Sequence, residues 1–291
     1  DSEMEHENKG RKAPALRGRG GAGKEGNDLR DIKAGFARPG AHPWPDDKCH
    51  ILKKLLLLFE MSEAEQQRSG FLRRQVIIRF SLAAILIPIT LYALAGTLQY
   101  WQGWLYWAVL VLPMTLAVSY LIKHNPELLE RRMRYQEKEK EQQTILKIGT
   151  ILFIAGFAAI GIDLRLHGLD NVPVAWILIA DLAILLGYLL ILWVFKENSY
   201  ASRTIEVVQD QQVITTGPYA IIRHPMYLGF LVMYLMTPIA LGSWWAVLVF
   251  SFYIPVLIWR ILNEEAVLLR DLPGYSEYCK KRRYRLLPHI W

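Results

Sequence analysis

The sequence predicts an all-α membrane protein with about six transmembrane helices, of which the last two form a tight helical hairpin. Hydrophobic residues make up 53% of the 291-residue chain, and they gather in long runs. A helix needs about 20 apolar residues to cross the hydrocarbon of a bilayer. Four runs reach that length and are apolar all round, as lipid-facing helices are: residues 76–98, 104–122, 145–166 and 174–195.

The last apolar stretch, residues 226–262, is too long for one crossing. Pro238 and the Gly-Ser pair at 242–243 interrupt it. Because these residues break helices, we expect two helices, 226–241 and 244–262, joined by a tight turn. The first of them is short for a complete crossing. One long kinked helix is the alternative.

Basic residues are concentrated in every second connection between the predicted spans, which predicts how the protein is oriented in the membrane. They lie before the first span, after the second, after the fourth and after the last. The other connections, 99–103, 165–173 and 242–243, contain one, Arg165. Positive charge marks cytoplasmic loops, so we expect a multi-pass protein with both termini in the cytoplasm. The net charge of +7 therefore indicates contact with anionic lipid and not with nucleic acid, since no basic stripe lies on a soluble domain.

Three regions follow from these patterns. Residues 1–60 are rich in Gly, Arg and charge and cannot bury a core, so we expect a leader that is disordered or foreign to the protein. A disordered tail with an amphipathic end is the alternative. Met61 is followed by the segment expected at the normal start of such a protein, a short polar stretch and then the basic flank of the first span. Residues 61–197 would hold the first four spans, and residues 198–291 a catalytic region.

Few titratable residues lie inside the predicted spans. Asp163, near the end of its span, is expected to pair with Arg165 at the membrane interface. Asp181 lies nearer the middle of its span and, because buried charge is costly, is either functional or hydrogen-bonded between helices. Two cysteines are too few for a disulfide framework, and no Cys/His cluster has the spacing of a metal site. We therefore expect no metal.

The first informative block follows the fourth span and reads ENSYASRTIEVVQDQQVITTGPYAIIRHPMYLG. Pro225 fits the first turn of a helix, where its missing N–H costs nothing. Unpaired backbone donors and Arg223 near that helix start would attract an anionic group. His224 and Tyr227 can add hydrogen bonds. Capping together with a membrane-surface arginine is the alternative interpretation.

The second block, RILNEEAVLLRDLPGYSEYCKKRRYRLLP, belongs to the last helix and the tail. Arg260 and Glu264 lie four residues apart on one face of the helix, whereas Glu265 points elsewhere. Alone, the pair would be a solvated ion pair that contributes well under about 1 kcal/mol. A short hairpin, however, returns both residues to the level of the RHPMY turn.

The two blocks together resemble the isoprenylcysteine carboxyl methyltransferase family. The resemblance lies in the segment GPYAIIRHPMYLG, the Arg-x-x-x-Glu-Glu helix that follows it, and the segment PGYSEYCKKRRYRLLP. The related phospholipid N-methyltransferases share this pattern. The resemblance covers residues 198–288. It implies S-adenosylmethionine bound in a cytoplasmic pocket formed by the loop and the C-terminal tail. Arg260 and Glu264 match the pair of residues that this family has at the substrate end of its site. Carried over by position, the residues in contact with the cofactor would be Gln209, Gln212, Val213, Ile214, Tyr219, His224, Pro225 and Tyr227.

The resemblance implies methyl transfer from S-adenosylmethionine to a lipid-like or prenylated acceptor, for which we expect a carboxylate. A carboxylate has a pKa of about 3.5 and needs no base, and Arg260 can hold it with its planar fork. An amine acceptor, as in phospholipid N-methylation, would need Glu264 as the base. The sequence also leaves open an NADPH-dependent membrane reductase of sterol type and a non-catalytic membrane scaffold.

Overall fold

The computed structural model describes residues 46–133, 137, 139–202, 204, 207 and 210–291, with the backbone alone for residues 46–69. The chain divides into two compact units, Asp1–Glu65 and Gln66–Trp291. In the first unit, the described part is helical from residue 46 onward. Apart from the bounds of α2, which begins in the first unit, all that follows concerns the second unit.

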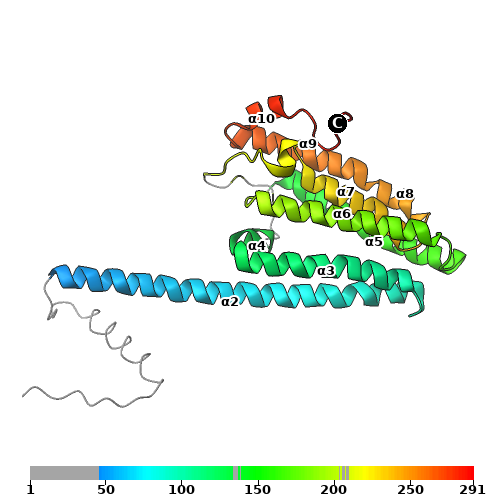
Figure 1. Cartoon of the computed structure of the whole chain (residues 1–291), viewed down its shortest axis with the longest axis horizontal. Helices are drawn as coiled ribbons and strands as arrows, with labels where there is room; N and C mark the ends of the chain where they lie inside the picture. Colours follow the sequence, from blue (N-terminus) through cyan, green and yellow to red (C-terminus); the bar gives the residue numbers. More distant parts are fainter. Residues whose placement is uncertain (1–45, 134–136, 138, 203, 205–206, 208–209) are drawn as a thin grey trace, which may run out of the picture. The chain divides into compact units, whose positions relative to one another are not determined.

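The described residues form helices and no strand, which confirms the predicted all-α class (Figure 1). In chain order the helices are α2 (Asp46–Ala95), α3 (Trp101–His124), α4 (Pro126–Met133), α5 (Lys140–His167), α6 (Val174–Glu197), the 3₁₀ helix η1 (Gly217–Ala220), α7 (Pro225–Ala240), α8 (Ala246–Ser251), α9 (Tyr253–Asp271) and α10 (Tyr275–Lys281).

Five of these segments are long and apolar enough to cross a membrane: Gly70–Ala95, Trp101–His124, Lys140–His167, Val174–Glu197 and Ala246–Asp271. The four predicted runs correspond to the first four. The last two helices correspond to the fifth of these segments, Ala246–Asp271, and to α7 before it. Helix α7 is the fifth predicted span, and its 16 residues measure about 24 Å at 1.5 Å per residue. The chain is therefore a multi-pass integral membrane protein whose α7 is shorter than a full crossing.

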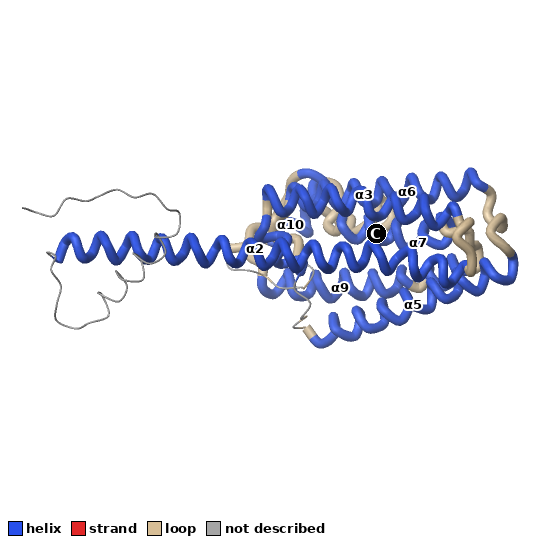
Figure 2. Tube along the Cα trace, turned by 90° about the horizontal axis from the view of Figure 1, so that it is seen from below, coloured by secondary structure: helices blue, strands red, loops and turns tan. Residues whose placement is uncertain are grey.

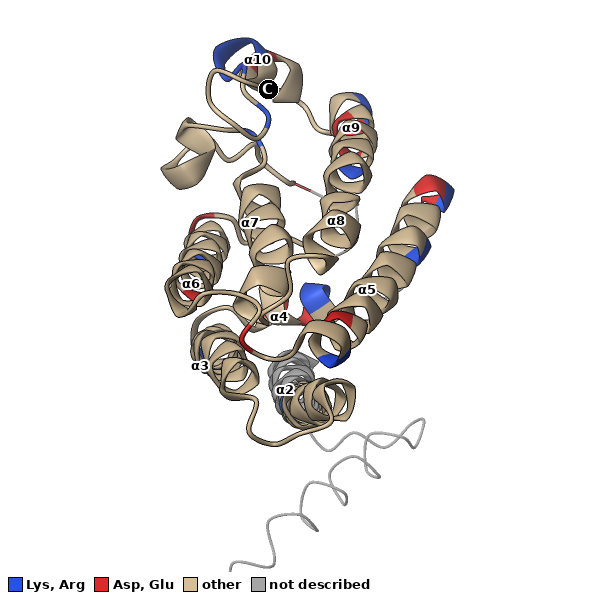
Figure 3. Cartoon of the chain, turned by 90° about the vertical axis from the view of Figure 1, so that its right-hand side faces the viewer, with Lys and Arg blue, Asp and Glu red and all other residues tan. Residues whose placement is uncertain are grey.

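The C-terminal hairpin is formed by two helical segments and not by one long kinked helix. Helix α7 ends at Ala240, and Gly242 in the turn has a φ of +78°, a conformation that a residue with a Cβ rarely adopts. The chain then returns through α8 and α9. Figure 3 shows α7 between α6 on one side and α8 on the other. The hairpin thus brings the second informative block back beside the first.

Helices α6 and α7 approach each other closely at two glycines. A Cβ added to Gly229 would lie 2.8 Å from the carbonyl oxygen of Gly187, and one added to Gly187 would lie 3.0 Å from the carbonyl oxygen of Gly229. Both contacts are with backbone, which cannot move aside as a side chain does. The glycine of the RHPMYLG block is therefore needed for helix packing.

The turn of the hairpin is anchored to α5 by Asp163. One of its carboxylate oxygens accepts from the Ser243 hydroxyl, and the other pairs with His167 Nδ1 at 2.6 Å. The expected pair with Arg165 is wrong. The Arg165 guanidinium donates instead to the carbonyl oxygens of Leu94 and Ala93, because residues two apart on a helix point in different directions.

Asp181 is buried in α6, with 4% of its surface exposed. Neither of its carboxylate oxygens has a hydrogen-bond partner within the part of the chain that the structure describes. The helix–helix hydrogen bond expected as one of its two roles is therefore absent among the residues that the structure describes. The residue also lies outside the cavities described below.

Candidate functional site

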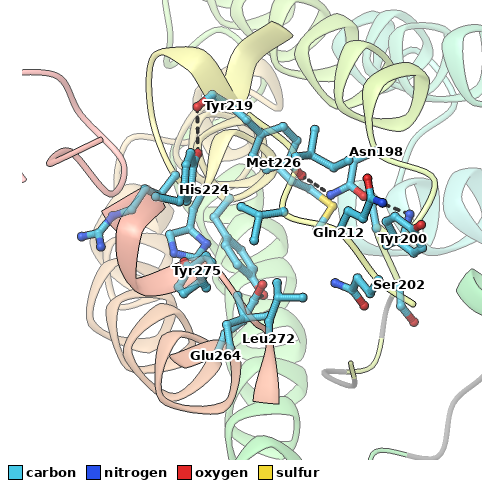
Figure 4. Close-up of a pocket in the computed structure, with 18 of the residues that line it drawn as sticks. Asn198, Tyr200, Ser202, Gln212, Tyr219, His224, Met226, Glu264, Leu272 and Tyr275 are labelled. Atoms are coloured by element: carbon cyan, nitrogen blue, oxygen red, sulfur yellow. Dashed lines mark hydrogen bonds between the residues drawn. The ribbon is translucent and has the colours of Figure 1, made fainter. Parts of the chain in front are cut away.

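A cavity lies where the loop after α6, η1, the start of α7, α9 and α10 converge. It encloses about 860 Å³ of space between atoms, part of it open to solvent. Figure 4 shows Asn198, Tyr200 and Ser202 on one side of the cavity and His224 and Tyr275 on the other. Its walls therefore come from segments that are up to about 80 residues apart in the chain.

Eight of the ten predicted site residues line this cavity: Gln212, Val213, Ile214, Tyr219, His224, Tyr227, Arg260 and Glu264. Pro225 does not line it but begins α7, the position that the missing N–H favours. Gln209 lies outside the described residues. The fold thus brings the two informative blocks to one place, while the roles of the individual residues stay predictions.

The C-terminal tail holds the segment before α7 through the backbone. The N–H of Arg223 donates to the carbonyl oxygen of Tyr284 at 3.0 Å, and that of His224 to the carbonyl oxygen of Arg285 at 2.9 Å. The Tyr278 hydroxyl donates to the carbonyl oxygen of Tyr219 at 2.7 Å. The expectation of unpaired donors ahead of this helix is therefore wrong for Arg223 and His224, because the tail occupies both.

Glu265 is the centre of a buried charge cluster behind the cavity. Its side chain is 5% exposed, and it contacts Arg223 at 3.2 Å, His224 Nε2 at 3.1 Å and Arg285 Nε at 2.8 Å. It points away from the cavity, as the helical spacing predicted. A buried carboxylate needs such partners, and in return it fixes the Arg-His pair that precedes α7.

The predicted pair Arg260 and Glu264 is joined through a third residue. The Tyr227 hydroxyl accepts from Arg260 Nε at 3.0 Å and donates to a carboxylate oxygen of Glu264. Within the described chain, no direct ion pair joins Arg260 to Glu264. Both side chains are half-buried. A solvated surface ion pair is therefore not what the structure shows.

Two polar atoms of cavity-lining residues lack partners. The Tyr275 hydroxyl and Arg223 Nε are buried and make no hydrogen bond to the described part of the protein. Buried polar groups are nearly always satisfied, so both atoms fit a cavity that takes a polar ligand. Burial raises the pKa of Tyr219 to about 12, and its neutral hydroxyl accepts from Asn198 at 2.8 Å.

The lining chemistry fits S-adenosylmethionine. Tyrosine rings can attract a sulfonium cation through their faces, and Glu264 adds a negative charge nearby. The unpartnered Tyr275 hydroxyl and Arg223 Nε can bind the polar groups of the molecule. The residues present therefore suit a cationic ligand that carries several hydrogen-bonding groups.

A second, more apolar cavity lies against the first. It is bounded by α5, α7 and α9 and lined by Ile145, Phe153, Phe230, Val256 and Leu257, among others. Figure 2 shows α5 and α9 side by side along this region. The residues that line both cavities are Ser202, Met226, Tyr227 and Arg260. Two cavities, of which the second has more apolar side chains in its lining, thus meet at one wall that includes Arg260.

Comparison with known proteins agrees with the resemblance seen in the motifs. Residues 175–272 match the model of a family described as phospholipid methyltransferase. The match covers about a third of the chain and shows that this region is similar to that family. The region includes α6, α7, α8, α9 and most of the cavity lining.

Two curated relatives match parts of the chain. Protein-S-isoprenylcysteine O-methyltransferase of Schizosaccharomyces pombe is 37% identical over 79 residues, which are 25% of this chain and 32% of the relative. Delta(14)-sterol reductase of Mus musculus is 29% identical over 91 residues, 30% of this chain and 22% of the relative. The matches thus span about a third and about a fifth of the two relatives' lengths.

Several cavity residues escaped the sequence analysis. Tyr275 and Tyr278 lie three apart in α10 and so share a helix face, a spacing that could have predicted that both point to the same side. Asn198 and Tyr200 lie in a loop with no periodic signal. Their position depends on tertiary contacts that the sequence pattern does not show.

Proposed function

We propose that this protein is an integral membrane methyltransferase that moves a methyl group from S-adenosylmethionine to a lipid-like or prenylated acceptor, most simply a carboxylate. The observation that carries the proposal is the wall of Ser202, Met226, Tyr227 and Arg260 shared by two adjacent cavities, of which the second has more apolar side chains in its lining. A cofactor in the first cavity and an apolar chain in the second would bring their reacting groups together there. The family match of residues 175–272 supports this proposal.

S-adenosylmethionine supplies an activated methyl group, so the protein has mainly to bind and orient. Tyr219, His224 and Tyr275 would hold the cofactor. Arg260 would hold an acceptor carboxylate with its planar fork, in line with the methyl carbon. Methyl transfer would then join the acceptor oxygen held by Arg260 to that carbon, with the carbon–sulfur bond broken and its electron pair left on sulfur. No proton has to leave.

An amine acceptor would change the role of Glu264. Its nitrogen must lose a proton, and Glu264 is a carboxylate that lines the cavity and could accept it. Transfer can be measured with radiolabelled S-adenosylmethionine and purified protein in liposomes. A farnesylated cysteine with a free carboxylate and phosphatidylethanolamine would serve as the two acceptors. We expect label on the carboxylate; label on the amine would reverse the assignment.

The similarity to a sterol reductase makes reduction with NADPH the second candidate. Calorimetry distinguishes the two, because each cofactor would occupy the same cavity. We expect S-adenosylmethionine and S-adenosylhomocysteine to bind and NADPH not to bind. Binding of NADPH alone would overturn the methyltransferase proposal.

We further propose that both termini and the cofactor cavity face the cytoplasm. The proposal is supported by the basic residues of the tail, which Figure 3 shows gathered at α10, and by the positive-inside rule. Cysteines placed at the exposed positions Asp170 and Ser276, in a chain without its native cysteines, would test it. An impermeant thiol reagent added outside intact cells should label position 170 and not position 276.

A further inference from the structure

Building on the methyl transfer proposed above, we propose that Gln142 of α5 is a positioning residue that orients the Arg260 guanidinium toward the acceptor. Gln142 is completely buried, with 0% of its surface exposed. It lies outside the family-matched region 175–272. The acceptor end of the site would therefore be completed by a helix from the N-terminal part of the bundle.

Gln142 contacts both ends of the helical turn that carries Arg260. Its side-chain oxygen accepts from an Arg260 terminal nitrogen at 2.9 Å. Its amide nitrogen donates to the Asn263 side-chain oxygen and, at 3.4 Å, to the Arg260 carbonyl oxygen. One side chain of α5 thus contacts the backbone, the charge and a neighbouring amide of α9.

The orientation of the Gln142 amide is fixed by a carboxylate one residue away. The Asn263 amide nitrogen donates to Glu141 at 2.6 Å, and an ionised carboxylate can only accept. The Asn263 oxygen must therefore face Gln142, so that the Gln142 nitrogen faces Asn263. This leaves the Gln142 oxygen directed at Arg260, where a donor such as the guanidinium is required.

Gln142 and Tyr227 hold different parts of the guanidinium. Tyr227 accepts from Nε at 3.0 Å, and Gln142 accepts from a terminal nitrogen at 2.9 Å. A contact at a second nitrogen restricts rotation of the guanidinium plane more than the contact at Nε does alone. Bidentate recognition of a carboxylate depends on the direction of that plane. The role of Gln142 is therefore to set this direction.

The matched pair Gln142→Leu and Gln102→Leu tests the proposal. Gln102 is an equally buried glutamine, 1% exposed, that lines neither cavity. Its amide donates to the Leu169 carbonyl oxygen at 2.9 Å. Gln142→Leu should lower kcat/KM for the acceptor about 10- to 100-fold, the range of one lost hydrogen bond to a charged group. Its Kd for S-adenosylmethionine should stay within about twofold. Gln102→Leu should change neither value.

The same substitution in an Arg260→Lys background separates positioning from a general effect on folding. Lysine has no planar fork for Gln142 to orient. Gln142→Leu should therefore cost less than about threefold in the residual activity of that background. An equal cost in both backgrounds would show that Gln142 acts through helix packing alone and would overturn the proposal.

A chemical readout keeps the test independent of methyl transfer. Phenylglyoxal modifies arginine side chains, and mass spectrometry of the peptide that contains Arg260 would measure the rate at this residue. Release from Gln142 should speed the reaction several-fold in Gln142→Leu and not in Gln102→Leu. An unchanged rate would refute the positioning role. If the wild-type protein transfers no methyl group while this rate does rise, the proposed function fails and the positioning of Arg260 by Gln142 stands.

Discussion

Replacing Tyr227 by phenylalanine removes one hydroxyl group and leaves the ring in its place. The ring is buried, 4% exposed, among Leu257, Ile261 and Leu286, so its packing should persist. The hydroxyl makes two hydrogen bonds to charged groups, one from Arg260 and one to Glu264. The substitution thus tests the bridge between the two residues and not the fold.

The expected magnitude follows from what replaces the two bonds. A hydrogen bond to a charged group contributes about 1.5–3 kcal/mol when its partner is left unsatisfied. Arg260 and Glu264 line a cavity that is partly open to solvent, so water can recover much of this energy. We expect a net loss of about 2 kcal/mol in transition-state stabilisation, or about 30-fold in kcat/KM for the acceptor.

Because the Tyr227 hydroxyl is committed to Arg260 and Glu264, its loss should hardly change cofactor binding. Calorimetry with S-adenosylhomocysteine should give a Kd within about twofold of wild type, while single-turnover transfer slows. The family resemblance alone would predict the opposite, since it places Tyr227 among the cofactor contacts. A tenfold weaker Kd with unchanged transfer would refute the bridging role.

Four further outcomes are expected. Arg260→Ala should abolish methyl transfer and leave the Kd for S-adenosylhomocysteine within about twofold, whereas full activity would remove Arg260 from the mechanism. Tyr275→Phe should weaken cofactor binding about 3- to 10-fold in calorimetry, because its unpartnered hydroxyl would lose about 1 kcal/mol of hydrogen bonding; an unchanged Kd would contradict this. Gly229→Ala should lower the midpoint of thermal unfolding, since overpacking costs about 1–3 kcal/mol, while Gly70→Ala, with open space around it, should not. Asp181→Leu should raise that midpoint, because it removes a buried carboxylate without partners in the described chain; a lower midpoint would indicate that Asp181 has a partner in the membrane.

The sequence predicted the hairpin because its breakers and apolar lengths are local properties. From that hairpin alone it followed that Arg260 and Glu264 return to the level of the RHPMY turn, and the structure places both in one cavity with Tyr227. Local sequence patterns could not predict the contacts among these side chains. Tyr227 bridges the pair only because of how α7 is rotated about its axis relative to α9. The apolar periodicity of a sequence does not specify such a rotation.

The roles of Glu265 and Gln142 could not be predicted, for a related reason. Glu265 is satisfied by Arg285, 20 residues along the chain, and Gln142 contacts Arg260 across 118 residues. In the sequence, Glu265 is one acidic residue among several, and Gln142 is one of two consecutive glutamines at the start of a span. Their importance comes from burial and from the partners that the fold supplies.

The anchoring of the hairpin turn by Asp163 has a consequence for how the protein is made. Helix α5 is synthesised and inserted about 80 residues before Ser243, so the Asp163 carboxylate enters the membrane without that partner. Helix α7 is too short to cross alone, and the turn after it, with Leu241 and Ser243 at 0% exposure, has to reach the far end of α5. The last two spans are therefore expected to insert together. The hydrogen bond from Ser243 to Asp163 would form only after this insertion, when the hairpin packs against α5.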